Sequence, residues 1–311
     1  MKKIILIAAA ALLAGFTAAA QDMEQATAAA KAANEAVMNG DYETALAGFR
    51  TALEQAEACG ADGMDIIAAC QDQIPRILLQ MGKDQIKEKN YDAALEKVNE
   101  ALEAAQEYEN ADVAGKAGAL IPTIKMSKAN DLLNAKDYGN AIAAFEEILA
   151  SDPDNGQAAL RLGMANYAAG NIDEAKTAFE TAAANGQQKA AAKTLSNICL
   201  KQAQGYLKEG KYKETIAAAE ESNSWLENAN AYKLAASAST KAKDNEAAIT
   251  YYEKYLEVAP TAKDAADINY TIAVLYQQQG NKAKAIEYYQ KVVLDPKYGE
   301  GAKQQIATLN K

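Results

Sequence analysis

The chain has 311 residues, of which 50% are hydrophobic and 24% charged, and its formal net charge is −10. Nucleic acids and anionic lipid surfaces are bound through basic patches, so this excess of acids argues against either as the main partner. The sequence contains no histidine, which removes the commonest general base and every serine–histidine or cysteine–histidine pair. Known hydrolase and metal-site motifs are also missing. We therefore expect no catalysis, no cofactor and no metal.

Residues 1–20 have the pattern of a secretory signal peptide. Lys2 and Lys3 precede an apolar run from Ile4 to Phe16, and small residues end the segment at Ala20. The apolar run has 13 residues, which is too short for a bilayer span of about 20 residues. We predict cleavage after this segment. The mature protein is then expected to be soluble and outside the cytoplasm, most simply in a bacterial periplasm.

From about residue 26 to 297 one pattern recurs seven times: a small residue followed four and seven positions later by apolar or small residues. In the first unit it reads Ala45, Phe49 and Ala52, with Tyr42 three residues earlier. The later units centre on Ala94, Ala141, Ala175, Thr215, Ala248 and Ala285. Spacings of 33 to 49 residues are typical of stacked helical hairpins, none of which buries its apolar face alone. The pattern predicts an all-α fold, an α-α superhelix.

The first two repeats are longer than the later ones. Residues 65–90 and 112–137 align at a constant offset, which pairs Ile74-Pro75 with Ile121-Pro122. Each stretch is expected to be helical beyond the usual hairpin length, with a kink or a restart at its proline. We divide the mature chain into elongated repeats over residues 21–121, compact repeats over 122–297 and a capping helix over 298–311.

Three cysteines, Cys59, Cys70 and Cys199, leave at least one unpaired in an oxidising compartment. Cys59 and Cys70 flank a turn at residues 60–63. In an antiparallel hairpin, however, the helical rise places them farther apart than a disulfide allows. Buried thiols are the favoured interpretation, and a Cys59–Cys70 disulfide stays an open alternative.

The repeated residues resemble those of the tetratricopeptide repeat family. In that family the first helix of each hairpin supplies a small residue that lets the second helix approach. Here these residues would be Ala33, Gly82, Ala129, Gly163, Ala203, Ala236 and Ala273. Gly170, Gly210 and Gly280 stand at hairpin turns, where a left-handed residue ends the first helix. The resemblance implies that the first helices line a concave inner face, where ligands are usually held.

Counted from those small residues, the inner face holds nine basic residues and one acid. Lysines at helix C-termini also complement the helix dipole without any ligand, and Lys87, Lys208 and Lys241 have that position. The predicted groove residues are Arg76, Lys83, Lys87, Asn130, Leu160, Arg161, Met164, Tyr167, Lys201, Lys208, Lys233 and Lys241. The apolar members of this set suit either packing between repeats or anchoring of a peptide.

The sequence therefore favours a non-enzymatic periplasmic adaptor that binds an acidic segment or C-terminal tail of a protein partner in a basic groove. One alternative is a small-molecule or glycan binder that uses groove tyrosines and amides, among them Tyr167, Tyr270, Gln277 and Asn230. Self-association through the ends of the superhelix is a third. The partner's identity and the oligomeric state are left open.

Overall fold

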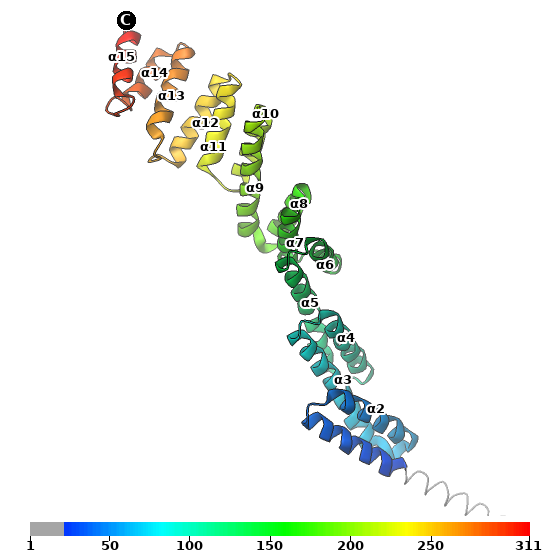
Figure 1. The fold of residues 1–311 in the computed structure, drawn as a ribbon. Helices are drawn as coiled ribbons and strands as arrows, with labels where there is room; N and C mark the ends of the chain where they lie inside the picture. Colours follow the sequence, from blue (N-terminus) through cyan, green and yellow to red (C-terminus); the bar gives the residue numbers. More distant parts are fainter. Residues whose placement is uncertain (1–21) are drawn as a thin grey trace, which may run out of the picture. The chain divides into compact units, whose positions relative to one another are not determined.

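The computed structural model describes residues 22–311, and the predicted signal peptide lies outside the described residues. The described part of the chain is helical, without strands (Figure 1). It forms two compact units, which divide between Pro153 and Asp154. The predicted all-α fold of stacked helical hairpins is confirmed in both units.

The first unit begins with a helix over residues 22–38. It continues with α2 (Tyr42–Ala58), the short η1 (Gly60–Gly63), α3 (Met64–Lys87), α4 (Tyr91–Glu107), α5 (Ala111–Asn134) and α6 (Tyr138–Ser151). Neighbouring helices pack in pairs, α2 with α3, α3 with α4 and α4 with α5. Small residues allow this close approach: a Cβ added at Gly82 would lie 2.6 Å from Cγ2 of the buried Val98.

The elongated hairpins contain two helices of 24 residues each, α3 and α5. Pro75 lies inside α3 and Pro122 inside α5, and both helices continue through their proline. The expected restart at the proline is therefore absent, although each proline removes one helical hydrogen bond. The expected division between repeat types after residue 121 falls inside α5, and it stays a prediction.

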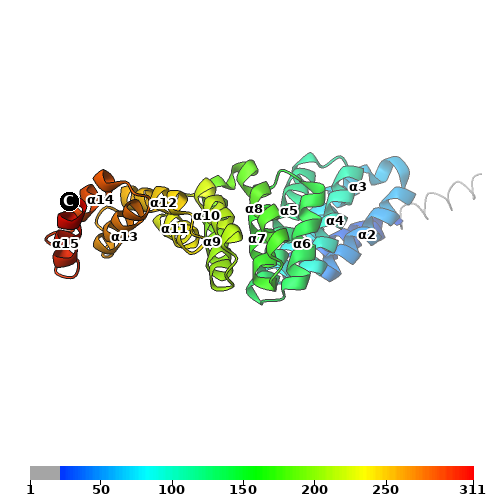
Figure 2. The ribbon, with the colours of Figure 1, turned by 90° about the horizontal axis from the view of Figure 1, so that it is seen from above.

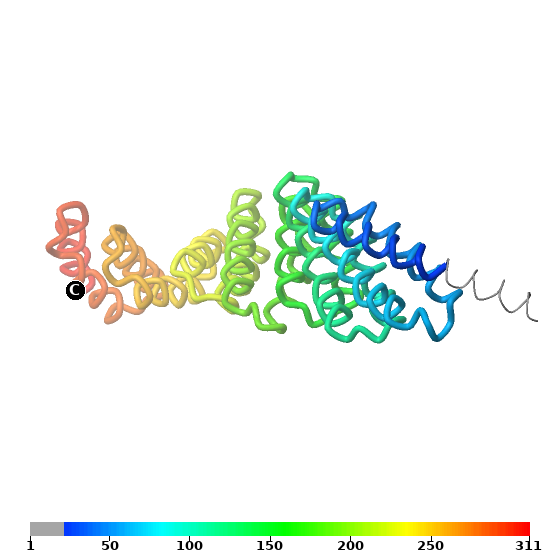
Figure 3. Tube along the Cα trace, turned by 90° about the horizontal axis from the view of Figure 1, so that it is seen from below, coloured from blue at the N-terminus to red at the C-terminus, as the bar shows by residue number. Residues whose placement is uncertain are grey.

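The second unit contains α7 (Gly156–Ala169), α8 (Ile172–Ala182), η2 (Ala183–Gln187), α9 (Gln188–Lys208), α10 (Tyr212–Trp225), α11 (Ala229–Lys241), α12 (Asn245–Val258), α13 (Ala265–Gln278), α14 (Lys282–Gln290) and α15 (Gly299–Leu309). Figure 3 shows the succession of hairpins from α9 to α15. Within this unit, α7 pairs with α8, α9 with α10, α11 with α12 and α13 with α14 (Figure 2). The odd-numbered helices are the first helices of the hairpins, which the sequence assigns to the inner face.

Left-handed residues end the first helix of several hairpins. Gly170, Gly210 and Gly280 have φ angles of 93°, 75° and 78°, as the sequence predicted. Lysine takes the same place at Lys136 and Lys243, each with φ 62°. A left-handed conformation costs a non-glycine residue about 1 kcal/mol, so these lysines occupy positions that glycine would fill at lower cost.

None of the helices in residues 22–311 combines the length and apolar character of a bilayer span. The same range contains no cluster of acidic residues and cysteines arranged to hold a metal ion.

Candidate functional site

Charge is divided between the two sides of the second unit. The helices α7, α9 and α11 together carry seven lysines and arginines and no acidic residue. The helices α8, α10 and α12 carry nine acidic residues and three lysines. The first helices α9 and α11 contact each other, and Lys176 of α8 pairs with Glu221 of α10, so the first helices form a basic side and the second helices an acidic side.

The basic side is most regular on α9. Lys193, Asn197, Lys201, Gln204 and Lys208 follow one another at intervals of four, four, three and four residues, which places them along one stripe of the helix. All five are exposed. Ion pairs on neighbouring helices are made by other lysines, such as Lys176 with Glu221 at 2.7 Å. We call these five residues the α9 stripe.

On α7, the predicted groove residues separate into core and surface. Leu160 is 6% exposed and belongs to the core, which agrees with the packing alternative and excludes it as an exposed groove residue. Met164 is 36% exposed, and the half-buried Tyr167 lies under the Lys201 ammonium, with 5.8 Å from Nζ to the ring centroid. Arg161 is half-buried, and its Nε is buried without a hydrogen bond to any described residue. Met164, Tyr167 and Lys201 thus form one mixed surface.

Lys233 on α11 is committed to an internal network. It pairs with Asp264, and its Nζ lies 5.7 Å from the Tyr255 ring centroid. Tyr255 donates a hydrogen bond of 2.5 Å to Asp264. Burial raises the pKa of Asp264, but the hydrogen bonds from Lys233 and Tyr255 outweigh it and hold that pKa below its usual value. Lys241, by contrast, is exposed at the end of α11 and stays available to a ligand.

A cavity of about 480 Å³ lies between the α11–α12 turn and α13. It is lined by Thr240, Lys243, Asn245, Thr271, Val274, Leu275 and Gln278. Thr240, Thr271, Val274 and Gln278 occupy positions that the repeat pattern assigns to the inner face. Lys243 and Asn245 lie in and after the turn between α11 and α12, so positions counted along the first helices do not include them.

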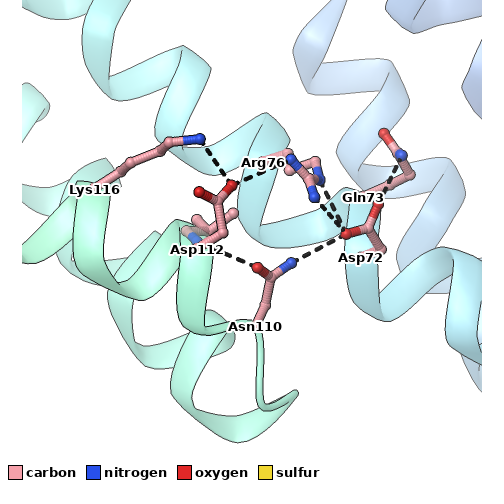
Figure 4. A network of polar contacts seen from close by, with 7 residues as sticks. Asp72, Gln73, Arg76, Asn110, Asp112 and Lys116 are labelled. Atoms are coloured by element: carbon pink, nitrogen blue, oxygen red, sulfur yellow. Dashed lines mark hydrogen bonds and ion pairs between the residues drawn. The ribbon is translucent and has the colours of Figure 1, made fainter.

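In the first unit, the exposed guanidinium of Arg76 is paired with two carboxylates of the protein itself (Figure 4). Its Nε donates to Asp72 at 3.0 Å, and its Nη1 lies 3.7 Å from the carboxylate of Asp112. Asn110 also donates to Asp72, at 3.1 Å, and Lys116 pairs with Asp112 at 2.7 Å. The hydrogen bond to Asp72 raises the pKa of Arg76. This network links α3 to α5 and gives the Arg76 guanidinium two carboxylate partners within the protein.

The other predicted residues of the first unit differ in how available they are to a ligand. Lys87 pairs with Asp84 at 2.7 Å, and this hydrogen bond lowers the pKa of Asp84. Asn130 is half-buried, and Lys83 is exposed. The helix α3 carries three acidic and three basic residues, so it is balanced where α9 is purely basic.

Two residues of the small-ligand alternative are occupied by packing near the C-terminus. Tyr270 stacks on Tyr298, with ring centroids 4.7 Å apart. Gln277 accepts a hydrogen bond from Tyr289 at 2.8 Å and donates one to Gln305 of α15 at 3.2 Å. The helix α15 therefore engages the first helix of the last hairpin, which removes these side chains from the surface proposed for a glycan.

The cysteines are poor nucleophiles in this fold. Cys70 and Cys199 are free, fully buried thiols. Burial raises the pKa of Cys70 to about 11 and that of Cys199 to about 12. Cys59 donates a hydrogen bond to the carbonyl of Gln55 at 3.3 Å. None of these environments favours a thiolate at neutral pH.

Helical hairpins that pack on one another through small residues define the class of helical repeat proteins. Models of the family described as tetratricopeptide repeat match residues 132–198, 229–261 and 266–294. These residues of the chain are therefore tetratricopeptide repeats. Proteins with such repeats are generally non-enzymatic scaffolds, and the match supports a protein-interaction scaffold here.

Three solved structures illustrate the similarity. The crystal structure of MamA is 18% identical and covers 58% of this chain and 96% of its own, with a TM-score of 0.31. YrrB, described as a TPR protein with an unusual peptide-binding site, is 19% identical over 58% of this chain and 91% of its own, with a TM-score of 0.32. The TPR2AB domain of yeast Sti1 in a pHSP90 complex is 14% identical over 77% of this chain and 100% of its own, with a TM-score of 0.32. Such low TM-scores carry no functional argument, and no curated protein matches the chain.

Proposed function

We propose that this protein is a non-enzymatic scaffold that binds an acidic, extended segment or C-terminal tail of a protein partner along the first helices of its second unit. One observation supports this most directly. In a chain with 42 acidic and 32 basic residues, α9 carries four lysines and no acidic residue. Three of these lysines lie on the exposed α9 stripe, where the ammonium groups can meet carboxylates.

The spacing of the lysines in the α9 stripe predicts the spacing of acidic residues in the partner segment. At 1.5 Å per residue, Lys193 and Lys201 lie about 12 Å apart along the helix, and Lys201 and Lys208 about 10.5 Å. An extended peptide advances about 3.4 Å per residue. Acidic residues three or four positions apart in the partner therefore reach successive lysines. Met164 and Tyr167 lie beside Lys201 and provide apolar contact for the residues between.

A periplasmic location is part of this proposal, and the predicted signal peptide supports it. Expression in a bacterium with an outer membrane tests it. The expected product is a periplasmic protein that begins at Gln21, as determined by mass spectrometry. A cytoplasmic product that retains residues 1–20 contradicts this location and leaves the binding surface unaffected.

The binding proposal is tested with a fluorescein-labelled peptide of glycine and serine that carries glutamate at every third or fourth position. In the test variant, Lys193, Lys201 and Lys208 are changed to glutamate. In the control variant the same change is made at Lys213, Lys263 and Lys282, which are exposed outside the first helices. Both variants alter the net charge equally, so they separate local contact from overall attraction.

Fluorescence anisotropy is expected to show at least about tenfold weaker binding for the α9 variant, because three exposed ion pairs of up to about 1 kcal/mol each are replaced by repulsion. Binding by the wild type should also weaken as salt rises. The control variant should lose about threefold or less. Equal losses in both variants, or none in either, would refute the proposal. Circular dichroism checks that both variants fold.

A further inference from the structure

The cavity between the α11–α12 turn and α13 is lined by aliphatic, hydroxyl and amide side chains and a single lysine. We infer that it receives one aliphatic side chain of the bound acidic segment, and that the residues at its rim hold the adjoining peptide group and a flanking carboxylate. This inference rests on the proposed function. The volume of about 480 Å³ lies within the range of roughly 300–1,000 Å³ common for ligand sites.

The walls of the cavity favour an apolar occupant. Val274 is half-buried and Leu275 buried, and both line the cavity. The hydroxyl groups of Thr240 and Thr271 donate to the carbonyls of Ala236 and Asp267, each at 2.8 Å. Their protons are thus committed to their own helices. A polar side chain would find few donors in these walls, whereas an aliphatic side chain loses water-exposed surface there.

Two amides at the cavity complement a peptide group. Asn245 donates from Nδ2 to Oε1 of Gln278 at 3.0 Å. This bond fixes the two side chains against each other across α12 and α13. It leaves Oδ1 of Asn245 as an acceptor and Nε2 of Gln278 as a donor, and neither makes a hydrogen bond to another described residue. One acceptor beside one donor matches the N–H and C=O of an extended chain.

Lys243 is the one charged residue among those that line the cavity. The carboxylates of the same turn, Asp244 and Glu246, line a different cavity together with Glu220. The ammonium group of Lys243 is therefore not neutralised from within this cavity. Lys241 lies two residues earlier and adds positive charge to the same turn. An acidic residue next to the buried aliphatic one is the complementary ligand.

The test uses two labelled peptides of the acidic design described above, one with a leucine between two glutamates and one with serine at that position. The wild type is expected to bind the leucine peptide about tenfold more tightly, because burial of one leucine side chain in an existing cavity supplies that factor. Val274→Phe fills the cavity and should abolish the difference between the peptides, while the serine peptide keeps its affinity.

Lys243→Gly tests the rim without endangering the fold, since glycine suits the φ of 62° at this position. It should weaken binding of the leucine peptide about threefold. Lys136→Gly is the matched control: it has the same φ of 62° and the same loss of charge, but lies in the first unit. It should leave binding unchanged.

The outcomes separate the two proposals. Equal affinity for both peptides in the wild type and in Val274→Phe overturns the cavity inference, while sensitivity to reversal of the α9 lysines keeps the proposed function. A leucine preference that Val274→Phe does not change also overturns the cavity inference. Failure of both peptides to bind overturns the proposed function, and the cavity inference with it.

Discussion

Gly163→Ala tests the idea that small residues set the distance between the helices of a hairpin. A Cβ added at Gly163 would lie 2.7 Å from two ring carbons of Phe179 and 2.9 Å from a third. Phe179 is fully buried, so its ring cannot swing away. Overpacking costs about 1–3 kcal/mol, and three contacts below 3.0 Å place this case at the upper end. Alanine regains about 1 kcal/mol of helix propensity. The expected net loss is about 2 kcal/mol.

Gly205→Ala is the control. Gly205 lies inside α9, and an added Cβ would meet no atom within 4 Å. Only the higher helix propensity of alanine then acts, so this variant should be more stable than the wild type by about 1 kcal/mol. The effect of a glycine-to-alanine change on stability thus differs by about 3 kcal/mol between α7 and α9. Hydrogen exchange read by mass spectrometry gives the local opening free energy for each hairpin, which suits a repeat protein whose hairpins do not all unfold together.

A second substitution tests whether contact with the Phe179 ring causes the loss of stability in Gly163→Ala. Phe179→Leu creates room, so the pair Gly163→Ala and Phe179→Leu should lose less than the sum of the single variants, with a coupling of about 1 kcal/mol or more. Zero coupling would refute the assigned contact. So would a Gly163→Ala variant whose α7 and α8 amides are better protected than those of the wild type.

Three further predictions concern buried polar groups. Ser239 is fully buried and its hydroxyl has no hydrogen-bond partner among the described residues, so Ser239→Ala should raise stability in urea by about 1 kcal/mol; a loss would contradict this. Burial and the bond to Asp264 raise the pKa of Tyr255 to about 12, so its stabilisation is complete below about pH 10 and is lost as pH rises to about 12. Tyrosinate absorbance and circular dichroism should change together there, less so in Tyr255→Phe, and ionisation at the usual pKa would refute it. Cys199, with its raised pKa and full burial, should react with dithionitrobenzoate only after unfolding, so rapid native reaction would contradict its placement.

The sequence was sufficient to predict the hairpins because contacts in a repeat stack are mostly between neighbours. Each hairpin reuses one spacing, so a small residue such as Ala203 or Ala236 marks a buried crossing without knowledge of distant parts. The same spacing assigned Leu160 to the groove, but its side chain is buried in the core. A position beside the groove and a position against the next hairpin differ by a small rotation of the helix, which the residue type alone does not reveal.

The charge of the candidate site was harder to predict, because it depends on partners that lie one hairpin away. Arg76 reaches Asp112 on α5, and Lys233 reaches Asp264 ahead of α13. Counting basic residues on the inner face includes both cations and misses the acids that neutralise them. The α9 stripe could be found from sequence alone, because an entire helix lacks acidic residues. Lys243 could not be found in this way, because the conformation of the α11–α12 turn brings it to the cavity.

The separation of charge between the two sides of the second unit has a consequence for how partners arrive. Each hairpin whose first helix is basic and whose second helix is acidic has an electric dipole across the stack, and hairpins stacked in the same sense add their dipoles. A molecule with such a transverse moment rotates in the field of an approaching polyanion before contact is made. For the acidic partner proposed above, encounters would begin with the lysine-bearing side already turned toward it, which would raise the association rate at low ionic strength although the protein as a whole is negative.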